Sequence, residues 1–232
     1  MSNLIKKGIV ALAMLIGVSS PAMAELIVSK ELVTNQYFEN GSYAGWSQVS
    51  GSSALRRYTT VDGVNRYYWL GGKSGYSVIQ SRKNMIYDES INAGLIGAGA
   101  VNFDFNVLLN SWSGDSDRVL AKVAFYDHSG ALTAQYNTGW TSRNSWGQYT
   151  ISGTVPMDAV SVSVLLYADR KSGTNNDGYV YAPSLNLSVT DQVALDTYGS
   201  LVVNAPAMLG AVSIGLMGLS GAAGRRKKLK KD

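Results

Sequence analysis

Four aromatic side chains are candidates to bind a sugar: Tyr68, Trp112, Trp140 and Trp146. The three tryptophans lie in or beside predicted loops, among Asp, Asn and Arg residues. There a flat ring can stack on the apolar face of a sugar while its polar neighbours bond to the hydroxyl groups. Tyr68 lies between Tyr67 and Trp69 in a predicted strand, so alternation places it on the opposite face from both. Large aromatics also fill sandwich cores, so core packing remains the alternative for each residue.

Residues that could catalyse a reaction are few. The chain has no cysteine and a single histidine. That residue, His128, lies in the predicted turn Asp127-His128-Ser129-Gly130, where no triad is evident. Asp115 and Asp117 could act as a glycosidase pair only if they faced one cleft, about 5 to 10 Å apart. No phosphate-binding glycine loop and no His-x-x-x-His pair is present. We therefore expect no enzyme, and keep a polysaccharide-active enzyme as the alternative.

The N-terminus has the features of a signal peptide. Two lysines, Lys6 and Lys7, precede the apolar residues 9–18, and Ala22-Met23-Ala24 supplies the small-x-small pattern that signal peptidase cuts. Cleavage after Ala24 would make Glu25 the first residue of the mature protein. An uncleaved N-terminal anchor is the alternative. The absence of cysteine also excludes a lipid anchor at a cysteine, thiol catalysis and disulfides.

The C-terminus has three consecutive parts. Val203-Asn204-Ala205-Pro206 is followed by the uncharged apolar residues 207–224 and then by a basic cluster that begins with Arg225-Arg226. At about 1.5 Å per helical residue, residues 207–224 just span a hydrocarbon core of roughly 30 Å. Basic residues after such a span hold that end on the cytoplasmic side. The body of the protein would then lie across the membrane.

This three-part tail resembles the PEP-CTERM sorting signals of bacteria, which consist of a short Pro-containing motif, a membrane helix and an Arg-rich end. Asn204-Ala205-Pro206 stands here where Pro-Glu-Pro is typical. The resemblance covers residues 203–231 and implies an exosortase that cuts near the motif and passes the protein to the cell surface or its exopolysaccharide. A plain C-terminal membrane anchor is the alternative.

The positive charge of the chain belongs to its ends. The whole chain carries +4, but residues 25–204 carry −3, whereas residues 1–24 carry +2 and residues 205–232 carry +5. Phosphate neutralisation needs a basic surface on the folded part. We therefore expect no nucleic-acid partner.

Between the ends, hydrophobic residues alternate with a period of two. Val101, Phe103 and Phe105 point one way while Asn102 and Asp104 point the other, which is typical of a strand with one buried face. Turn residues separate these runs and include Asn175-Asn176-Asp177-Gly178. A short helix is expected only within residues 84–95. The roughly nine strands predict an antiparallel sandwich or barrel. The strand-like runs identified are residues 57–61, 66–70, 76–80, 101–109, 118–126, 148–152, 160–166 and 179–189.

The segment Asn35-Gln36-Tyr37-Phe38-Glu39-Asn40-Gly41, followed by Gly45-Trp46, resembles the opening of jelly-roll domains of the galactose-binding-like superfamily. The resemblance spans most of residues 32–189 and implies an all-β, antiparallel jelly-roll β-sandwich. Many such domains hold a structural calcium near the first and last strands, where Glu39 and Asp177 would be ligands. Tyr181-Ala182-Pro183 stands where those domains commonly carry an Asp and an Asn. The alternative places Glu39 in a turn hydrogen bond and Asp177 in an exposed turn.

Together these features predict five segments: a signal peptide (1–24), a jelly-roll domain (25–192), a linker with the sorting motif (193–206), a transmembrane helix (207–224) and a basic cytoplasmic tail (225–232). The expected protein is exported, passes through an inner-membrane-anchored precursor and ends at the cell surface or in the extracellular matrix. Its expected partners are signal peptidase, an exosortase and matrix polysaccharide. The expected role is non-catalytic carbohydrate binding or adhesion in exopolysaccharide or biofilm, with a purely structural surface protein as a further alternative.

Overall fold

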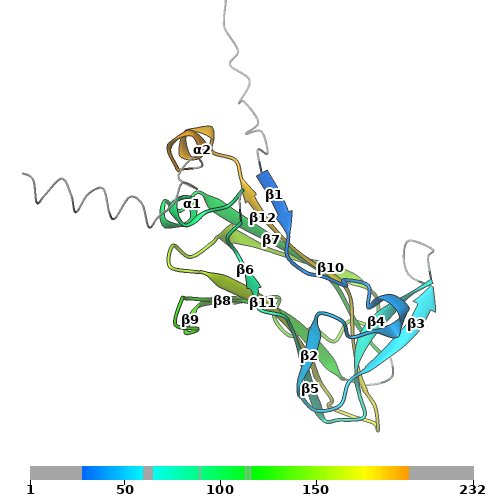
Figure 1. Ribbon diagram of the computed structural model, residues 1–232. Coiled ribbons are helices and arrows are strands. Elements are labelled where there is room, and N and C mark those ends of the chain that lie inside the picture. The colour runs from blue at the N-terminus through cyan, green and yellow to red at the C-terminus, as the bar shows by residue number, and fades with distance from the viewer. Residues whose placement is uncertain (1–27, 60–64, 89, 113, 115, 199–232) are drawn as a thin grey trace, which may run out of the picture.

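The computed structural model describes residues 28–59, 65–88, 90–112, 114 and 116–198. Two antiparallel sheets pack face to face as the layers of a sandwich (Figure 1). The first sheet has the order β10-β7-β12-β4-β3, with β1 also paired to β12, and the second has the order β2-β5-β11-β8-β9, with β6 also paired to β11. The expected all-β antiparallel sandwich is thus confirmed.

The first sheet comprises β1 (Val28–Glu31), β3 (Ala54–Thr59), β4 (Asn65–Gly72), β7 (Val101–Ser111), β10 (Gly147–Thr154) and β12 (Asn176–Val189). The second comprises β2 (Trp46–Ser50), β5 (Tyr76–Ser81), β6 (Asn84–Met85), β8 (Arg118–Tyr126), β9 (Leu132–Asn137) and β11 (Ser161–Asp169). Three short helices complete the described residues: η1 (Glu39–Gly41), α1 (Ala93–Gly97) and α2 (Gln192–Tyr198).

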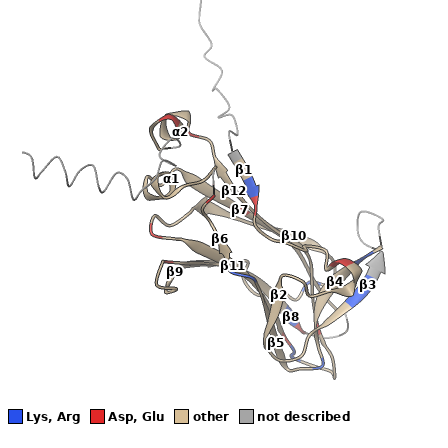
Figure 2. Ribbon diagram, in the orientation of Figure 1, with Lys and Arg blue, Asp and Glu red and all other residues tan. Residues whose placement is uncertain are grey.

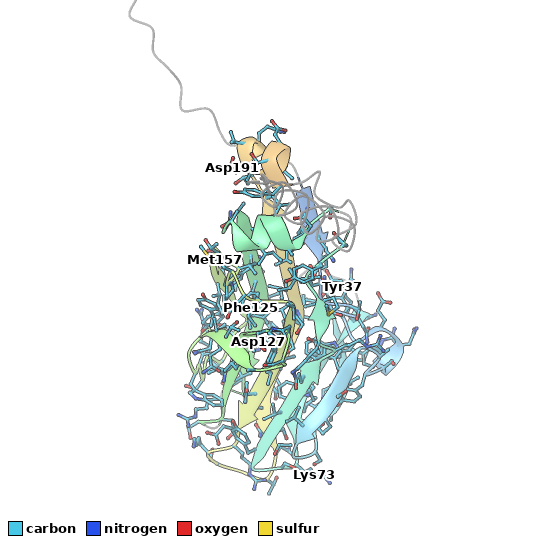
Figure 3. The ribbon with its side chains drawn as sticks, turned by 60° about the vertical axis from the view of Figure 1, so that its left-hand side comes forward. Tyr37, Lys73, Phe125, Asp127, Met157 and Asp191 are labelled. Atoms are coloured by element: carbon cyan, nitrogen blue, oxygen red, sulfur yellow. The ribbon has the colours of Figure 1, made fainter. Side chains whose placement is uncertain are left out.

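The core lies between the sheets and follows the predicted alternation. In β7, Phe103, Phe105 and Leu109 have no exposed surface, while Asp104 on the outer face is exposed. The rings of Phe103 and Phe125 meet across the layers with centroids 5.1 Å apart. Figure 3 shows Phe125 inside the sandwich, between Asp191 at one end and Lys73 at the other.

The predicted helix is wrong over residues 84–92, because α1 begins only at Ala93. Asn84 and Met85 form a strand that pairs with β11. Asp88 then accepts hydrogen bonds from the backbone N–H groups of Ser90 and Ile91, which closes a turn instead of a helix. The helix α1 begins only after this turn, with an N-cap at Asn92.

The predicted turn at residues 175–178 is also wrong, because β12 begins at Asn176. The Asn176 side chain is fully buried, and its amide group donates hydrogen bonds to the carbonyl oxygens of Ser74 and Ala168. These bonds tie the start of β12 to the β4–β5 turn and to β11 of the second sheet, so a residue pattern typical of a turn forms part of a strand.

Residues 193–198, expected as linker, form most of helix α2. The amide of Asn92, beside α1, donates a hydrogen bond to the carbonyl oxygen of Tyr198, and Ala194 is buried. No helix within the described residues is long and apolar enough to cross a membrane. The signal peptide, the sorting motif, the apolar run and the basic tail all lie outside the described residues, so these assignments stay predictions.

Candidate functional site

An aromatic cluster covers part of the outer face of the first sheet. Tyr68 on β4 meets Trp146 with ring centroids 5.9 Å apart and Tyr179 on β12 at 5.3 Å, both nearly edge to face. Trp146 also meets Tyr181 at 6.1 Å, and Tyr181 meets Tyr37 at 5.5 Å. We call these five residues the outer aromatic cluster. It is a second apolar cluster, separate from the core between the sheets.

Strand alternation places Tyr68 in this cluster. In β4, Tyr67 and Trp69 pack toward the core, and Trp69 has no exposed surface. Tyr68 points to the outer face, as predicted. It retains only 6% of its exposed surface because Trp146 and Tyr179 pack against it. Tyr68 therefore packs behind the rings of the site, and the rings accessible to a ligand are those of Trp112 and Trp146.

A cleft of about 470 Å³ opens beside the cluster, between the end of β7 and the start of β10. Trp112 is 57% exposed at its rim, and the Trp146 ring forms another wall. Polar groups alternate with these rings, which is the composition of a small-ligand site. The lining residues are Arg56, Tyr68, Asn110, Ser111, Trp112, Asn144, Ser145, Trp146 and Tyr179.

One polar atom of the cleft has an unusual environment. The side-chain oxygen of Asn110 is buried and accepts no hydrogen bond from any residue that the structure describes. A buried acceptor without a partner is costly, and such a group in a native structure often marks a place for a ligand or a water molecule. Because Asn110 lines the cleft, its oxygen is a candidate to accept a hydrogen bond from a ligand hydroxyl group.

Buried hydrogen bonds hold one side of the cleft in place. Burial and a hydrogen bond donated to Asp177 at 2.9 Å raise the pKa of the Tyr179 hydroxyl above its ordinary value. The backbone carbonyl of Asp177 accepts a hydrogen bond from the backbone N–H of Trp112 at 3.2 Å. Asp177 in turn donates its own backbone N–H to the carboxylate of Asp117 at 2.8 Å.

Asp117 is a structural residue. It is fully buried, and besides Asp177 it accepts the backbone N–H groups of Lys171 at 2.6 Å and Ser172 at 3.1 Å. A carboxylate enclosed in this way cannot face a shared cleft, which removes its part in the predicted glycosidase pair. Asp115 lies outside the described residues.

Next to the outer aromatic cluster, arginines line a more polar cleft of about 500 Å³. The guanidinium carbon of Arg66 lies 3.9 Å above the ring centroid of Tyr37. Arg57 and Glu39 line the same cleft, and Figure 2 shows the basic segment of β3 beside the acidic residue of η1. Charged side chains of both signs line this cleft, so it is not counted as part of the aromatic site.

The structure brings three of the four predicted ligand-binding residues together. Tyr68, Trp112 and Trp146 line one cleft. Trp140 lies apart from them on the second sheet, where its ring meets Tyr167 of β11 with centroids 6.4 Å apart. Trp140 therefore does not line this cleft, and its role in ligand binding stays a prediction.

The sequence-based prediction did not include several residues of this surface, among them Tyr179, Tyr181, Arg56 and Asn110. Tyr179 and Tyr181 alternate with the core residue Val180 in β12, so the period of two places both on the outer face, beside Tyr68. That signal was present in the sequence. Arg56 and Asn110 come from strands β3 and β7, and no local pattern shows that these strands border one cleft.

The two predicted calcium ligands have separate surroundings. Glu39 is exposed in η1, whereas Asp177 lies within β12, partly buried, and not in the exposed turn that was the alternative. The described residues hold no group of three or more His, Asp or Glu side chains suited to a metal ion. Hard cations need six to eight oxygen ligands. Calcium at Glu39 and Asp177 stays an untested prediction.

No protein-family model matches the chain, and no curated protein matches it. Among solved structures, the chain is similar to the enzymatically active domain of tailspike protein 4 from bacteriophage CBA120. The identity is 13% and the TM-score 0.49, over 66% of this chain and 21% of that one.

Two further likenesses are to proteins crystallised with sugars. One is a Clostridium thermocellum xylanase 10B chain, with CBM22-1 and GH10 modules, complexed with xylohexaose: identity 13%, TM-score 0.45, covering 68% of this chain and 28% of that one. The other is TmCBM61 in complex with β-1,4-galactotriose. The identity is 10% and the TM-score 0.46, over 67% of this chain and 97% of that one. The match spans less than a third of the tailspike and xylanase chains. At such low TM-scores these likenesses carry no argument about function.

Proposed function

We propose that this chain is an exported, non-catalytic carbohydrate-binding protein of the cell surface or its matrix. The observation that carries the proposal is the cleft on the first sheet, where Trp112 and Trp146 stand around polar groups. A ring that is accessible at a cleft and backed by packed tyrosines offers a flat, rigid surface to the apolar face of a sugar. The amide and hydroxyl groups of Asn110, Asn144 and Ser145 supply hydrogen bonds to its hydroxyls.

The extent of the surface favours a polysaccharide chain over a single sugar. The outer aromatic cluster joins β12 and β4, and the cleft reaches from the β7–β10 end to Arg56 on β3. Neighbouring strands are about 4.8 Å apart, so the path across β7, β12, β4 and β3 covers roughly 14 Å. A linear polymer can lie along that path and use several contacts at once.

Replacement of Trp112 tests the site. Trp112→Ala should weaken binding of a neutral polysaccharide by about 1 to 3 kcal/mol, the scale of an aromatic hot spot, and leave the melting temperature nearly unchanged, since the ring is largely exposed. Tyr68→Ala should instead lower the melting temperature, because Tyr68 is packed beneath Trp146. Binding is measured by affinity electrophoresis in xylan or galactan gels, with a detergent that has no sugar headgroup. The melting temperature is measured by thermal unfolding of the same full-length variants.

Trp140→Ala is the matched control, since Trp140 is also partly exposed, at 38%, but lies on the second sheet. It should retain affinity for the neutral polysaccharide. Equal losses from both substitutions, or no binding by the parent protein to any neutral polysaccharide, would remove the proposed site. Release of new reducing ends from the polysaccharide would instead identify an enzyme.

The proposal includes export and sorting, which are supported by the sequence of the two ends. Mass spectrometry of the mature surface protein should find Glu25 as its first residue and should not find residues 225–232. The reason is that Ala22-Met23-Ala24 fits signal peptidase and the Pro206 motif precedes an apolar run with a basic end. Surface protein with an intact basic tail would contradict sorting by cleavage and leave a plain anchor.

A further inference from the structure

A row of aromatic rings lies on the outer face of the second sheet, on the side of the sandwich away from the first cleft. Tyr167 of β11 stands at its centre, with Tyr76 of β5 at a centroid distance of 6.3 Å and Trp140 at 6.4 Å. Tyr76 is 44% exposed and Trp140 38%. The loop that carries Trp140 is held against β8 by two backbone hydrogen bonds between Val119 and Thr141, at 2.8 and 2.9 Å.

Cations from β8 stand over two of these rings. The guanidinium carbon of Arg118 lies 4.6 Å from the centroid of Trp140, and the ammonium group of Lys122 lies 5.1 Å from that of Tyr167. Arg118 and Lys122 are four residues apart on one strand, so they share a face and their Cα atoms are about 13 Å apart. The face therefore presents two basic side chains, each beside an aromatic ring.

The charges on this face do not cancel. Arg118 bonds to Asp169 through two nitrogen atoms at 2.8 Å each, and Lys171 reaches the same carboxylate oxygen at 2.8 Å. Three cations with one carboxylate give the row a charge of +2, whereas residues 25–204 as a whole carry −3. We call Tyr76, Arg118, Lys122, Trp140, Tyr167, Asp169 and Lys171 the cationic row. It is a local reversal of sign on an acidic body.

We propose that the cationic row is a second binding site, for an acidic polysaccharide such as a polymer of uronic acids. Spaced carboxylates of the polymer would meet Lys122 and the Arg118–Lys171 group, and its sugar rings would lie against Trp140 and Tyr76. A nucleic acid is a less suitable occupant, because the charge of the row is small and the body around it repels a dense row of phosphates.

This site is independent of the first cleft, since the two lie on opposite outer faces of the sandwich and share no residue. A protein with both sites joins two polysaccharide chains. Linking two binding events on one rigid body converts weak contacts into strong retention in a matrix.

The test is binding of full-length protein to soluble polygalacturonate in the same detergent. Lys122→Gln should weaken binding by roughly fivefold and Trp140→Ala by a similar factor, since each removes one half of a cation–ring pair. Lys122→Arg should retain affinity for polygalacturonate. Added salt should weaken polygalacturonate binding by the parent protein more than binding by the Lys122→Gln variant. Arg57→Gln, an exposed arginine on β3, removes the same charge from the opposite sheet and should bind as the parent does.

Several outcomes would overturn the second site. The first is that the parent protein does not bind polygalacturonate. The second is that Arg57→Gln lowers the affinity for polygalacturonate as much as Lys122→Gln does. The third is that a single-stranded oligonucleotide displaces bound polygalacturonate at a lower concentration of negative charge than free polygalacturonate needs. The two sites are tested apart, because Trp112→Ala should leave polygalacturonate binding unchanged and Lys122→Gln should leave neutral polysaccharide binding unchanged. If the protein joins the two polymers, the parent protein should make a mixture of neutral and acidic polysaccharides turbid. The Trp112→Ala and Lys122→Gln variants should not.

Discussion

Replacing Phe105 by Ala should lower the free energy of unfolding by about 3 to 5 kcal/mol. Phe105 has no exposed surface and points from β7 into the core between the sheets. The substitution removes a whole ring from a closely packed interior, where neighbouring side chains refill the space only in part. Chemical denaturation of full-length parent and variant, with an unchanged slope against denaturant, is the measurement.

Asn106→Ala is the control from the same strand. Its side chain lies on the outer face, where its oxygen accepts a hydrogen bond from the Thr150 hydroxyl at 2.7 Å in exposed surroundings. Water replaces that bond, so the loss should stay under about 1 kcal/mol. Equal losses from Phe105→Ala and Asn106→Ala would mean that the faces of β7 are assigned wrongly, and with them the outer face on which the first cleft is built.

Asp117→Ala should also be strongly destabilising, by about 2 to 5 kcal/mol. The fully buried carboxylate accepts backbone N–H groups from Lys171, Ser172 and Asp177, and its removal leaves these three partly buried donors without that partner. Because Asp177 also accepts the backbone N–H of Trp112, the variant should lose affinity for neutral polysaccharide as well as stability. Thermal unfolding and affinity electrophoresis of the same protein measure the two effects.

Asp127→Ala provides the comparison for burial. Asp127 accepts the backbone N–H groups of Ser129 and Ala131 in the β8–β9 turn, much as Asp117 does in its loop, but these hydrogen bonds are exposed to water. Water satisfies these donors once the carboxylate is gone, so the loss should be clearly smaller. A larger loss from Asp127→Ala than from Asp117→Ala would contradict the structural role assigned to Asp117.

The two proposed surfaces differ in what positions them. The first cleft depends on buried polar contacts, with Asp117 and Asp177 behind Trp112. The cationic row depends on strand pairing, since β8 and β11 hold Arg118 opposite Asp169 in register. We therefore expect damage at Asp117 to affect the first site more than the second.

The sequence by itself determined the strands with a clear period of two. Residues 118–126 were predicted with the bounds that β8 has, and β7 begins at the predicted Val101. The opposite faces of Tyr68 and Trp69 followed from the same alternation, which is a local property of an extended chain. The strands that were missed, β1, β2, β6 and β9, are short, and sheet edges or side pairings stabilise them more than their own pattern does.

Only the tertiary structure decided which aromatic residues share a site. Thr141 pairs with Val119 on β8, yet the carbonyl of Arg143 accepts hydrogen bonds from Ser111 at the end of β7. The chain therefore crosses from the second sheet to the first between these residues, so Trp140 stays with the second sheet and Trp146 reaches Tyr68 on the first. Local periodicity reports which face of a strand a residue occupies. It carries no information on which sheet the strand joins, because that depends on pairing between distant segments.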